Sequence, residues 1–270
     1  MKISITHNTQ YYYSSEVPKL IQCVKLYPSI CKNQELLGWK IYASHGKITE
    51  SHVDALGHKI FNIYNNNFKG KLKITSSGTV KTKDYSGVIK GLKEKVNPLC
   101  FLRQTDLTKP CKRIRKISEN RKLKTHDIVE YAHKLNLIVS DCIEYVSGST
   151  STSTNSEQAL KQGKGVCQDF AHILISVARS KNLPARYVNG FLLETSNSGE
   201  NTTHAWTEIF LKGLGWVGFD PSHKKCIDDK YVRVSTGLDF IDASTIKGVK
   251  INYAGTESLK STVKITASQQ

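Results

Sequence analysis

The first 90 residues contain short runs in which apolar and polar side chains alternate or apolar side chains predominate. These runs cover residues 2–6, 22–27, 39–42, 59–64 and 72–75. Alternation with a period of two is typical of β-strands, because successive side chains of a strand point to opposite faces. Turn-forming sequences separate the runs at residues 56–58, 65–67 and 76–78. The pattern therefore predicts an N-terminal β domain over residues 1–90.

From residue 125 onward, apolar side chains recur at intervals of three and four, which predicts helices. Thr125 is the expected N-cap of the first helix, and Pro184 follows the last one. The predicted helices cover residues 125–148, 156–163 and 167–182. Residues 186–193, 205–211 and 216–219 then return to the pattern of strands. Helices followed by strands predict an α+β core over residues 125–245.

Residues 91–124 follow neither period. Pro98 and Pro110 interrupt this segment, and its second half carries the densest basic run of the chain, from Lys109 to Lys124. We expect a basic connecting segment that crosses the surface without a core of its own. Beyond the core, residues 246–270 form the predicted C-terminal strand and tail, in which the alternation over residues 259–266 predicts an edge strand.

The formal charge of +16 is concentrated in the first half of the chain, where residues 1–150 hold 25 Lys/Arg against 12 Asp/Glu. A run such as Lys109 to Lys124 attracts acidic proteins, anionic lipids or nucleic acids, but charge runs are more often solvated faces. No nucleic-acid-binding motif accompanies the charge. We therefore expect no specific nucleic acid, and an acidic partner at this run is the alternative to a solvated face.

The seven cysteines are odd in number, scattered, and without a C-x-x-C pair. This pattern argues against a disulfide framework and against a structural zinc site. The first residues lack the apolar run of a secretory leader, and no stretch approaches the roughly 18 apolar residues of a membrane-spanning helix. We expect reduced thiols, no cleaved leader, no membrane association and a cytoplasmic protein.

Cys167 stands at the predicted start of a helix, four residues after Gly163 and two after Gly165. A cysteine attacks as its thiolate, and the unpaired N–H groups and dipole at a helix start favour negative charge. The two glycines permit close approach of a substrate, and nearby backbone amides could bind a developing oxyanion. Taken alone, a cysteine near a helix start is more often a packed side chain than a nucleophile.

His204 begins a predicted strand after a polar stretch, and Asp220 ends the strand that follows. Neighbouring antiparallel strands bring such residues within hydrogen-bonding reach of each other. A histidine that takes the thiol proton needs a fixed acceptor on its second nitrogen, and Asp220 offers one. Each has a simpler explanation alone, His204 as an edge histidine and Asp220 as the start of an Asp-Pro-Ser turn. Only the combination with Cys167 predicts a triad.

Several segments carry a family resemblance. In the core they are Gly165-Val166-Cys167-Gln168-Asp169-Phe170-Ala171-His172, Pro184-Ala185-Arg186-Tyr187-Val188-x-Gly190, His204-Ala205-Trp206-x-Glu208 and Gly215-Trp216-x-x-Phe219-Asp220-Pro221. Outside it they are Tyr11-Tyr12-Tyr13, Asp54-Ala55-Leu56-Gly57-His58 and Gly237-Leu238-Asp239-Phe240-x-Asp242. Together they resemble the bacterial transglutaminase-like family, least so over residues 86–124.

This resemblance implies a papain-like, transglutaminase-type core of helices packed on an antiparallel sheet, preceded by an N-terminal β domain. It also implies a Cys-His-Asp triad at Cys167, His204 and Asp220. The calcium of the eukaryotic transglutaminases is not carried over, because no acidic loop of EF-hand type is present. His223 and Cys226 lack further zinc ligands nearby, so we expect neither a metal nor a cofactor.

Three neighbours of the triad are candidates for substrate binding or support. Trp206 shares a strand face with His204 and would wall the site against water, unless it serves core packing. Gln162, five residues before Cys167, could donate to an oxyanion, although a surface glutamine at a helix end is the simpler role. Gly165 would allow close approach, and we favour backbone amides as the oxyanion donors.

The chemistry expected of this triad is acyl transfer from an amide or peptide substrate through a thioester. Water as the acceptor makes the protein an amidase or peptidase, which we favour, and an amine makes it a protein-glutamine transamidase. A non-catalytic module of the same fold, binding an acidic partner through the basic half of the chain, is the alternative from another class.

Overall fold

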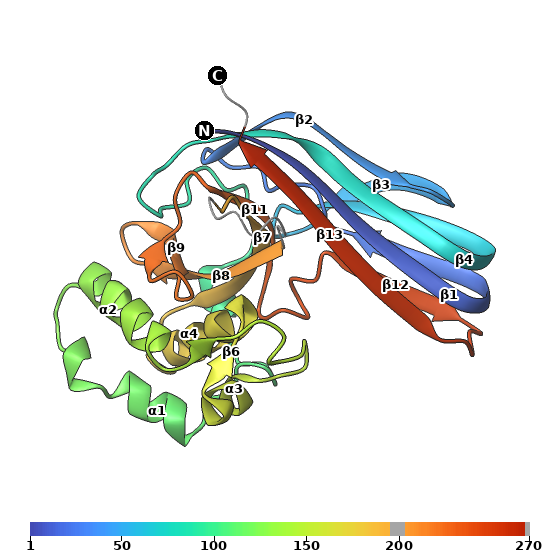
Figure 1. The fold of residues 1–270 in the computed structure, drawn as a ribbon. Helices are drawn as coiled ribbons and strands as arrows, with labels where there is room; N and C mark the ends of the chain where they lie inside the picture. The colour runs from blue at the N-terminus through green and yellow to red at the C-terminus, as the bar shows by residue number, and fades with distance from the viewer. Residues whose placement is uncertain (195–202, 268–270) are drawn as a thin grey trace.

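The computed structural model describes residues 1–194 and 203–267. A long, twisted antiparallel sheet forms one side of the molecule, and a smaller unit of helices and a second sheet is packed against one end of it (Figure 1). This arrangement is the predicted α+β class, with a β-rich N-terminal region before a papain-like core. Across the two described stretches, no helix combines the length and apolarity needed to cross a membrane.

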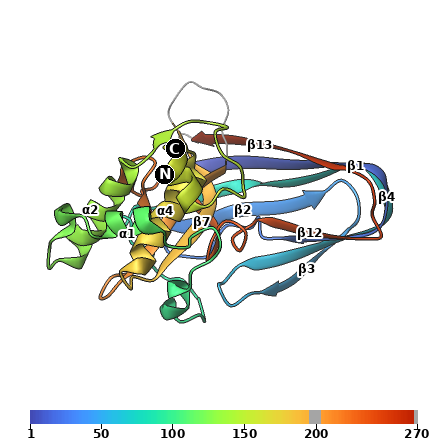
Figure 2. The ribbon, with the colours of Figure 1, turned by 90° about the horizontal axis from the view of Figure 1, so that it is seen from below.

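Two strands of more than 20 residues form the centre of the long sheet. They are β1 (Lys2–Val24) and β4 (Lys59–Thr82), which pair antiparallel. The shorter strands β2 (Gln34–Ala43) and β3 (Lys47–Val53) pair with β4. On the other side, β12 (Ile246–Ile251) and β13 (Glu257–Ala267) pair with β1 (Figures 1 and 2). The predicted strand over residues 259–266 is thereby confirmed.

The predicted short strands of the N-terminal region are parts of longer ones. Residues 65–67 and 76–78, predicted as turns, lie inside β4, and all of them except Asn67 are paired with β1. Gly78 is required there by packing, because a Cβ atom would lie 2.0 Å from the Gly38 carbonyl oxygen of β2. The turn predicted at residues 56–58 is confirmed between β3 and β4, with Gly57 at a φ of +79°.

The second sheet has the strand order β10-β9-β8-β7-β11. Its strands are β7 (Ala185–Leu192), β8 (Thr203–Leu211), β9 (Gly215–Asp220), β10 (Lys225–Cys226) and β11 (Tyr231–Gly237). Helix α4 (Cys167–Ser180) packs on one face, and its residues Phe170 to Arg179 are all buried. The strands predicted for β7, β8 and β9 are confirmed, whereas β11 was missed.

Three further helices surround α4: α1 (Lys112–Ser118), α2 (Ile128–Ser140) and α3 (Ser156–Gln162) (Figure 2). Short elements complete the region: η1 (Pro98–Leu102), η2 (Arg121–Leu123), β5 (Glu144–Tyr145) and β6 (Lys164–Gly165). Helix α3 is as predicted, and Gly163 ends it in the left-handed region. The connecting segment contributes more to the hydrophobic core than expected, since Ile114 of α1 is fully buried in the core around α4.

Helix α2 is shorter than predicted at both ends. Its N-cap is Asp127, not Thr125, because the Asp127 carboxylate accepts from the backbone N–H groups of Val129 and Glu130. It ends at Ser140, where the chain turns to form β5. The parallel pairing of β5 with β6 sets Tyr145 beside Gly165, two residues before Cys167, which an uninterrupted helix could not do.

A buried ion network ties three strands of the second sheet to the connecting segment. Glu208 of β8 accepts from Arg186 of β7 at 2.6 Å and from Arg233 of β11 at 2.8 Å. Glu94 pairs with the same two arginines at 2.6 and 3.3 Å. Burial acts to raise the pKa of Glu208, but the charges of Arg233 and Arg186 outweigh it and lower that pKa. The Arg186 guanidinium also lies 3.8 Å from the centroid of the Trp216 ring.

We predict that Glu208→Gln destabilises the protein by about 3–5 kcal/mol, because two buried guanidinium groups lose an anionic partner. Urea unfolding followed by circular dichroism measures this free energy. The control is Asp141→Asn, which removes the exposed ion pair with Lys224 and should leave the midpoint unchanged. An equal midpoint for wild type and Glu208→Gln would show that the network contributes nothing to stability.

Candidate active site

Cys167 is the first residue of α4 and is partly exposed. Asp169 stabilises the start of the helix, because its carboxylate accepts from the Val166 N–H at 2.8 Å and from the Thr150 hydroxyl at 2.6 Å. Gly165 has to be a glycine here, since a Cβ atom would lie 2.7 Å from the Asp169 Cβ. The tight turn leaves the Cys167 side chain at the N-terminal end of the helix.

His204 and Asp220 lie on the same face of the second sheet, near the ends of neighbouring strands. The register pairs Thr207 with Phe219, so Asp220 is diagonal to His204 across β8 and β9. His204 Nε2 lies 2.6 Å from Asp220 Oδ2. The other ring nitrogen, Nδ1, is not used by Asp220, and Cys167 lies close enough to His204 to act on its pKa. The structure thus brings together the three side chains that the sequence predicted.

The surroundings of His204 and Asp220 favour their charged forms. Burial acts to lower the pKa of His204, but the hydrogen bonds and charges of Asp220 and Cys167 outweigh it and raise this pKa to about 10. Burial likewise acts to raise the pKa of Asp220, yet the hydrogen bonds with His204 and His223 hold it well below its usual range. An ionised carboxylate and a protonated imidazole are the expected pair over the neutral pH range.

Asp220 makes more contacts than the sequence suggested. Its Oδ2 also accepts from the Tyr231 hydroxyl at 2.8 Å and lies 2.9 Å from His223 Nδ1. Its Oδ1 accepts from the Ser222 hydroxyl at 2.6 Å. Sequence reasoning missed both His223 and Tyr231. The Asp-Pro-Ser-His turn was a usable signal for His223, since a turn brings its fourth residue back to its first. No signal existed for Tyr231, which comes from the unpredicted strand β11.

Trp206 and Tyr145 flank the triad on two sides. Trp206 is fully buried, stacks 6.3 Å from the His204 ring and meets the Tyr231 ring edge-on at 5.4 Å. It therefore both supports His204 and packs in the core. Tyr145 is half exposed and stacks on Phe170 of α4. Burial, followed by the negative charges of Cys167, Glu194 and Asp220, raises the pKa of Tyr145 to about 12.

Gln162 is the remaining predicted neighbour of the triad. It is the last residue of α3 and is exposed. Among the residues that the structure describes, no hydrogen bond joins its amide to Cys167 or His204. The simpler role weighed for Gln162, a surface residue at a helix end, matches this position.

His204, Asp220 and His223 offer three ligand atoms within 4.8 Å of one another, which is close enough to hold a metal ion. Two of the separations are 2.6 and 2.9 Å, the distances of hydrogen bonds. Two ligands of a tetrahedral zinc lie about 3.3 Å apart, given Zn–N bonds of about 2.0–2.1 Å. A metal in this place would have to break the His204–Asp220 bond, so the geometry fits a hydrogen-bonded group better.

Two family matches cover most of the chain. Residues 115–221 match the transglutaminase-like superfamily, and residues 3–81 match the bacterial transglutaminase-like N-terminal region. The first match contains all three residues of the candidate triad. The second ends within β4, so it covers the N-terminal part of the long sheet and not the strands β12 and β13 that complete it.

Uncharacterised mycobacterial proteins are among the curated relatives. One from Mycobacterium leprae is 34% identical over 129 residues, which is 46% of this chain and 45% of that protein. One from Mycobacterium tuberculosis is 34% identical over 115 residues, which is 39% of this chain and 37% of that protein. The matched part of this chain thus spans less than half the length of either relative.

Among solved structures, a provisionally assigned cysteine protease from Cytophaga hutchinsonii has the same fold. The two superpose with a TM-score of 0.76, over 100% of this chain and 92% of that one, at 20% sequence identity. The agreement extends over both the long sheet and the core, which establishes the architecture as a whole.

We predict that His223→Ala slows the alkylation of Cys167 by about 3–10-fold, because Asp220 loses one of the donors that orient it toward His204. His223→Asn keeps a side-chain N–H close to the position of Nδ1 and should restore most of the rate. Iodoacetamide labelling followed by peptide mapping measures the rates. Equal rates in the wild type and both variants would show that Asp220 is oriented without His223.

Proposed function

The chain belongs to the transglutaminase-like superfamily, and from this premise we propose that it is a cysteine enzyme that transfers acyl groups from amide or peptide substrates. Cys167 is the proposed nucleophile, His204 its acid and base, and Asp220 the carboxylate that orients His204. The observation that carries the proposal is the bond of 2.6 Å between His204 Nε2 and Asp220 Oδ2, which leaves Nδ1 to the thiol.

The proposed reaction begins with a charge pair of the Cys167 thiolate and the His204 imidazolium. Sγ attacks the substrate carbonyl carbon, and the carbonyl electrons move to oxygen to form a tetrahedral oxyanion. As this intermediate collapses, the C–N bond breaks and His204 gives its proton to the leaving amine. A thioester on Cys167 remains. Backbone N–H groups at the start of α4 are the proposed oxyanion donors, because the helix leaves them without partners.

In the second half of the reaction, neutral His204 takes a proton from the acceptor while the acceptor attacks the thioester carbon. The C–S bond then breaks and releases the Cys167 thiolate, which restores the charge pair with His204. Water yields a carboxylic acid, and an amine yields a new amide. Asp220 stabilises the imidazolium that forms each time and does not itself take the proton. Its dense set of donors suits this role, because a carboxylate with several hydrogen bonds stays ionised.

We favour hydrolysis over transamidation. Cys167 is partly exposed, so bulk water reaches the thioester without an opening step. Transamidation is the second candidate, since the same three residues serve it equally well. A non-catalytic module is less well supported, because a packed fold does not need a buried Asp220 aimed at His204 beside a partly exposed cysteine. A reducing, cytoplasmic location is part of the proposal, and all seven cysteines are free thiols.

The first test is whether Cys167 is activated. His204 keeps its proton up to a pH of about 10, so the charge pair exists below that pH and is lost as the pH rises through it. At about pH 6, iodoacetamide should label Cys167 at least about tenfold faster than the exposed Cys100. The preference should fade as the pH rises above about 8.5, where ordinary exposed thiols ionise as well, and it should be absent at about pH 6 in His204→Ala. Cys142, whose pKa burial raises to about 11, is the slow internal reference.

Labelling of Cys167 no faster than Cys100 at about pH 6 would reject the activated pair and support the non-catalytic module. The same conclusion follows if His204→Ala leaves the rate unchanged. The buried and exposed reference thiols are present in every sample, so the comparison does not depend on the amount of folded protein.

The second test identifies the acceptor. Model carboxamides and peptides are incubated with wild-type protein, with and without a primary amine, and the products are separated by mass spectrometry. We expect acid products in both conditions and none with Cys167→Ala. Amide conjugates that outweigh the acid when amine is present would assign the protein as a transamidase instead.

A further inference from the structure

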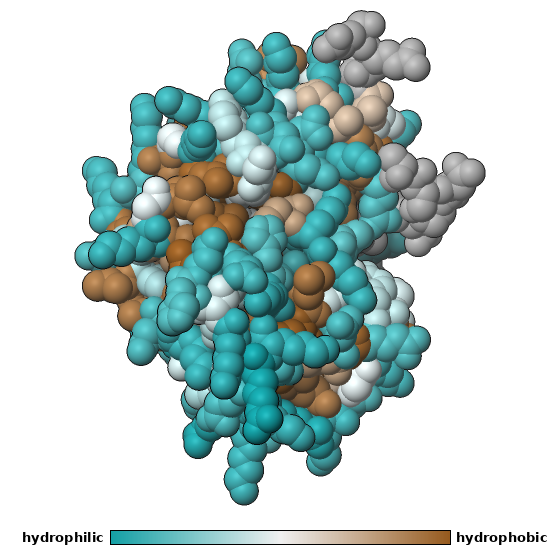
Figure 3. All heavy atoms as spheres, turned by 90° about the vertical axis from the view of Figure 1, so that its left-hand side faces the viewer, coloured by the Kyte–Doolittle hydropathy of each residue, from teal (hydrophilic) through white to brown (hydrophobic). Residues whose placement is uncertain are grey.

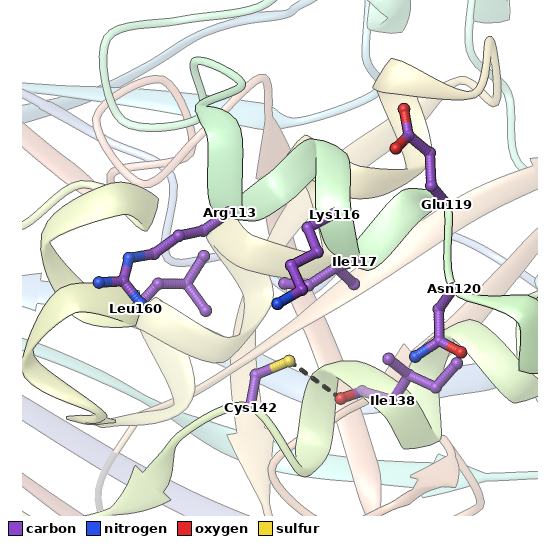
Figure 4. Close-up of a pocket in the computed structure, with 8 residues that line it drawn as sticks. All are labelled: Arg113, Lys116, Ile117, Glu119, Asn120, Ile138, Cys142 and Leu160. Carbon is purple, nitrogen blue, oxygen red and sulfur yellow. Dashed lines mark hydrogen bonds between the residues drawn. The ribbon is translucent and has the colours of Figure 1, made fainter.

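Helices α1, α2 and α3 border a cavity of about 580 Å³ that is open to solvent, and none of the triad residues lines it (Figure 4). Apolar surface is exposed among hydrophilic side chains on the helical side of the molecule (Figure 3). The cavity volume falls within the range of about 300–1,000 Å³ typical of small-molecule sites. The acyl-transfer chemistry proposed for Cys167 gives this cavity no role.

The floor of the cavity is apolar. Ile117 of α1, Ile138 of α2 and the buried Leu160 of α3 line it. The Cys142 thiol also faces it and donates to the Ile138 carbonyl oxygen at 3.1 Å, so its single donor is already used (Figure 4). Because burial raises the pKa of Cys142 to about 11, this thiol stays neutral at physiological pH. The floor therefore offers a ligand apolar contact and no charge.

Two cationic side chains, Arg113 and Lys116, lie above this apolar floor. Arg113 and Lys116 are one turn apart on α1, both are exposed, and their charged ends extend over the cavity toward Leu160 and Cys142 (Figure 4). Neither makes an ion pair with any residue in the stretches 1–194 and 203–267. Glu119 lies at the far edge with its carboxylate turned away from Cys142 (Figure 4). The cavity thus combines an apolar base with positive charge on one rim.

We propose that this cavity binds an anionic amphiphile, a small molecule with a carboxylate or phosphate head and an apolar body. The Arg113 guanidinium can donate two parallel N–H bonds to two oxygens of either head group, and Lys116 adds a second charge. The apolar floor binds the body of the ligand, and the two cations select an anionic head group over a neutral one. Nucleic acid fits less well, because the lining holds no aromatic side chain on which a base could stack.

The test uses the full chain with Cys167→Ala, which excludes covalent reaction with the ligand. Dodecanoate and dodecyl phosphate are titrated separately by calorimetry, with dodecanol as the uncharged control. We expect binding of at least one of the two anions, and no comparable binding of dodecanol. The two anions separate the possible head groups, since binding of only one identifies its head as the one the cavity accepts.

A matched pair of double variants locates the site. Arg113→Gln with Lys116→Gln should weaken the binding at least about tenfold. Lys112→Gln with Arg115→Gln removes one lysine and one arginine from the same helix, but neither residue lines the cavity, and it should change the affinity less than about twofold. Cys142→Phe, which fills the floor and keeps both cations, should also abolish binding.

Three results would overturn the proposal. They are an equal loss of affinity in both double variants, equal affinity for dodecanol, and no binding of either anion by the protein with its cavity intact. None of them bears on the labelling of Cys167, so this inference and the proposed function fail or succeed separately.

Discussion

The buried carboxylate of Asp220 is the group on which the candidate active site depends. A charge removed from water is tolerated only when donors surround it, and here they come from separate parts of the fold. His204 is on β8, Tyr231 on β11, and His223 in the turn after β9. The same hydrogen bonds that stabilise the buried Asp220 carboxylate also orient His204. A change that removes one of them is therefore expected to affect both the stability of the fold around Asp220 and the geometry of the triad.

The opposite side of the site depends on the start of α4. Gly165 and Asp169 pack too closely for any other residue at position 165, and this closeness positions the first turn of the helix. The helix itself is held by neighbours on every side, with α1, α2 and α3 around it and the second sheet below. The ion pairs of Arg233 with Glu208 and with Glu94 then hold the second sheet against the connecting segment. Cys167 lies beside His204 because helix α4, which begins at Cys167, packs on the second sheet, which carries His204.

The densest basic run of the chain lies on a different part of the molecule from this chemistry. The run from Lys109 to Lys124 forms α1 and η2, on the outer side of the helical layer (Figure 1). Its apolar residues face inward, and Ile114 is fully buried against α4. The segment therefore packs its apolar side chains into the core and exposes its charged side chains to solvent. The many charged residues obscure the period of a helix in its sequence.

The sequence alone determined the class of the fold, most of the elements around the site and the identity of the three triad candidates, because local periodicity and short motifs encode these properties. The tertiary structure decided what depends on distant partners. Pairing with β1 keeps β4 extended through two segments whose sequences are typical of turns. The pairing of β5 with β6 ends α2 earlier than its sequence predicts. The tertiary structure also brought Tyr231 onto Asp220 and placed α1, α2 and α3 around an open cavity. Such contacts join residues far apart in the chain, and no local pattern of side chains records them.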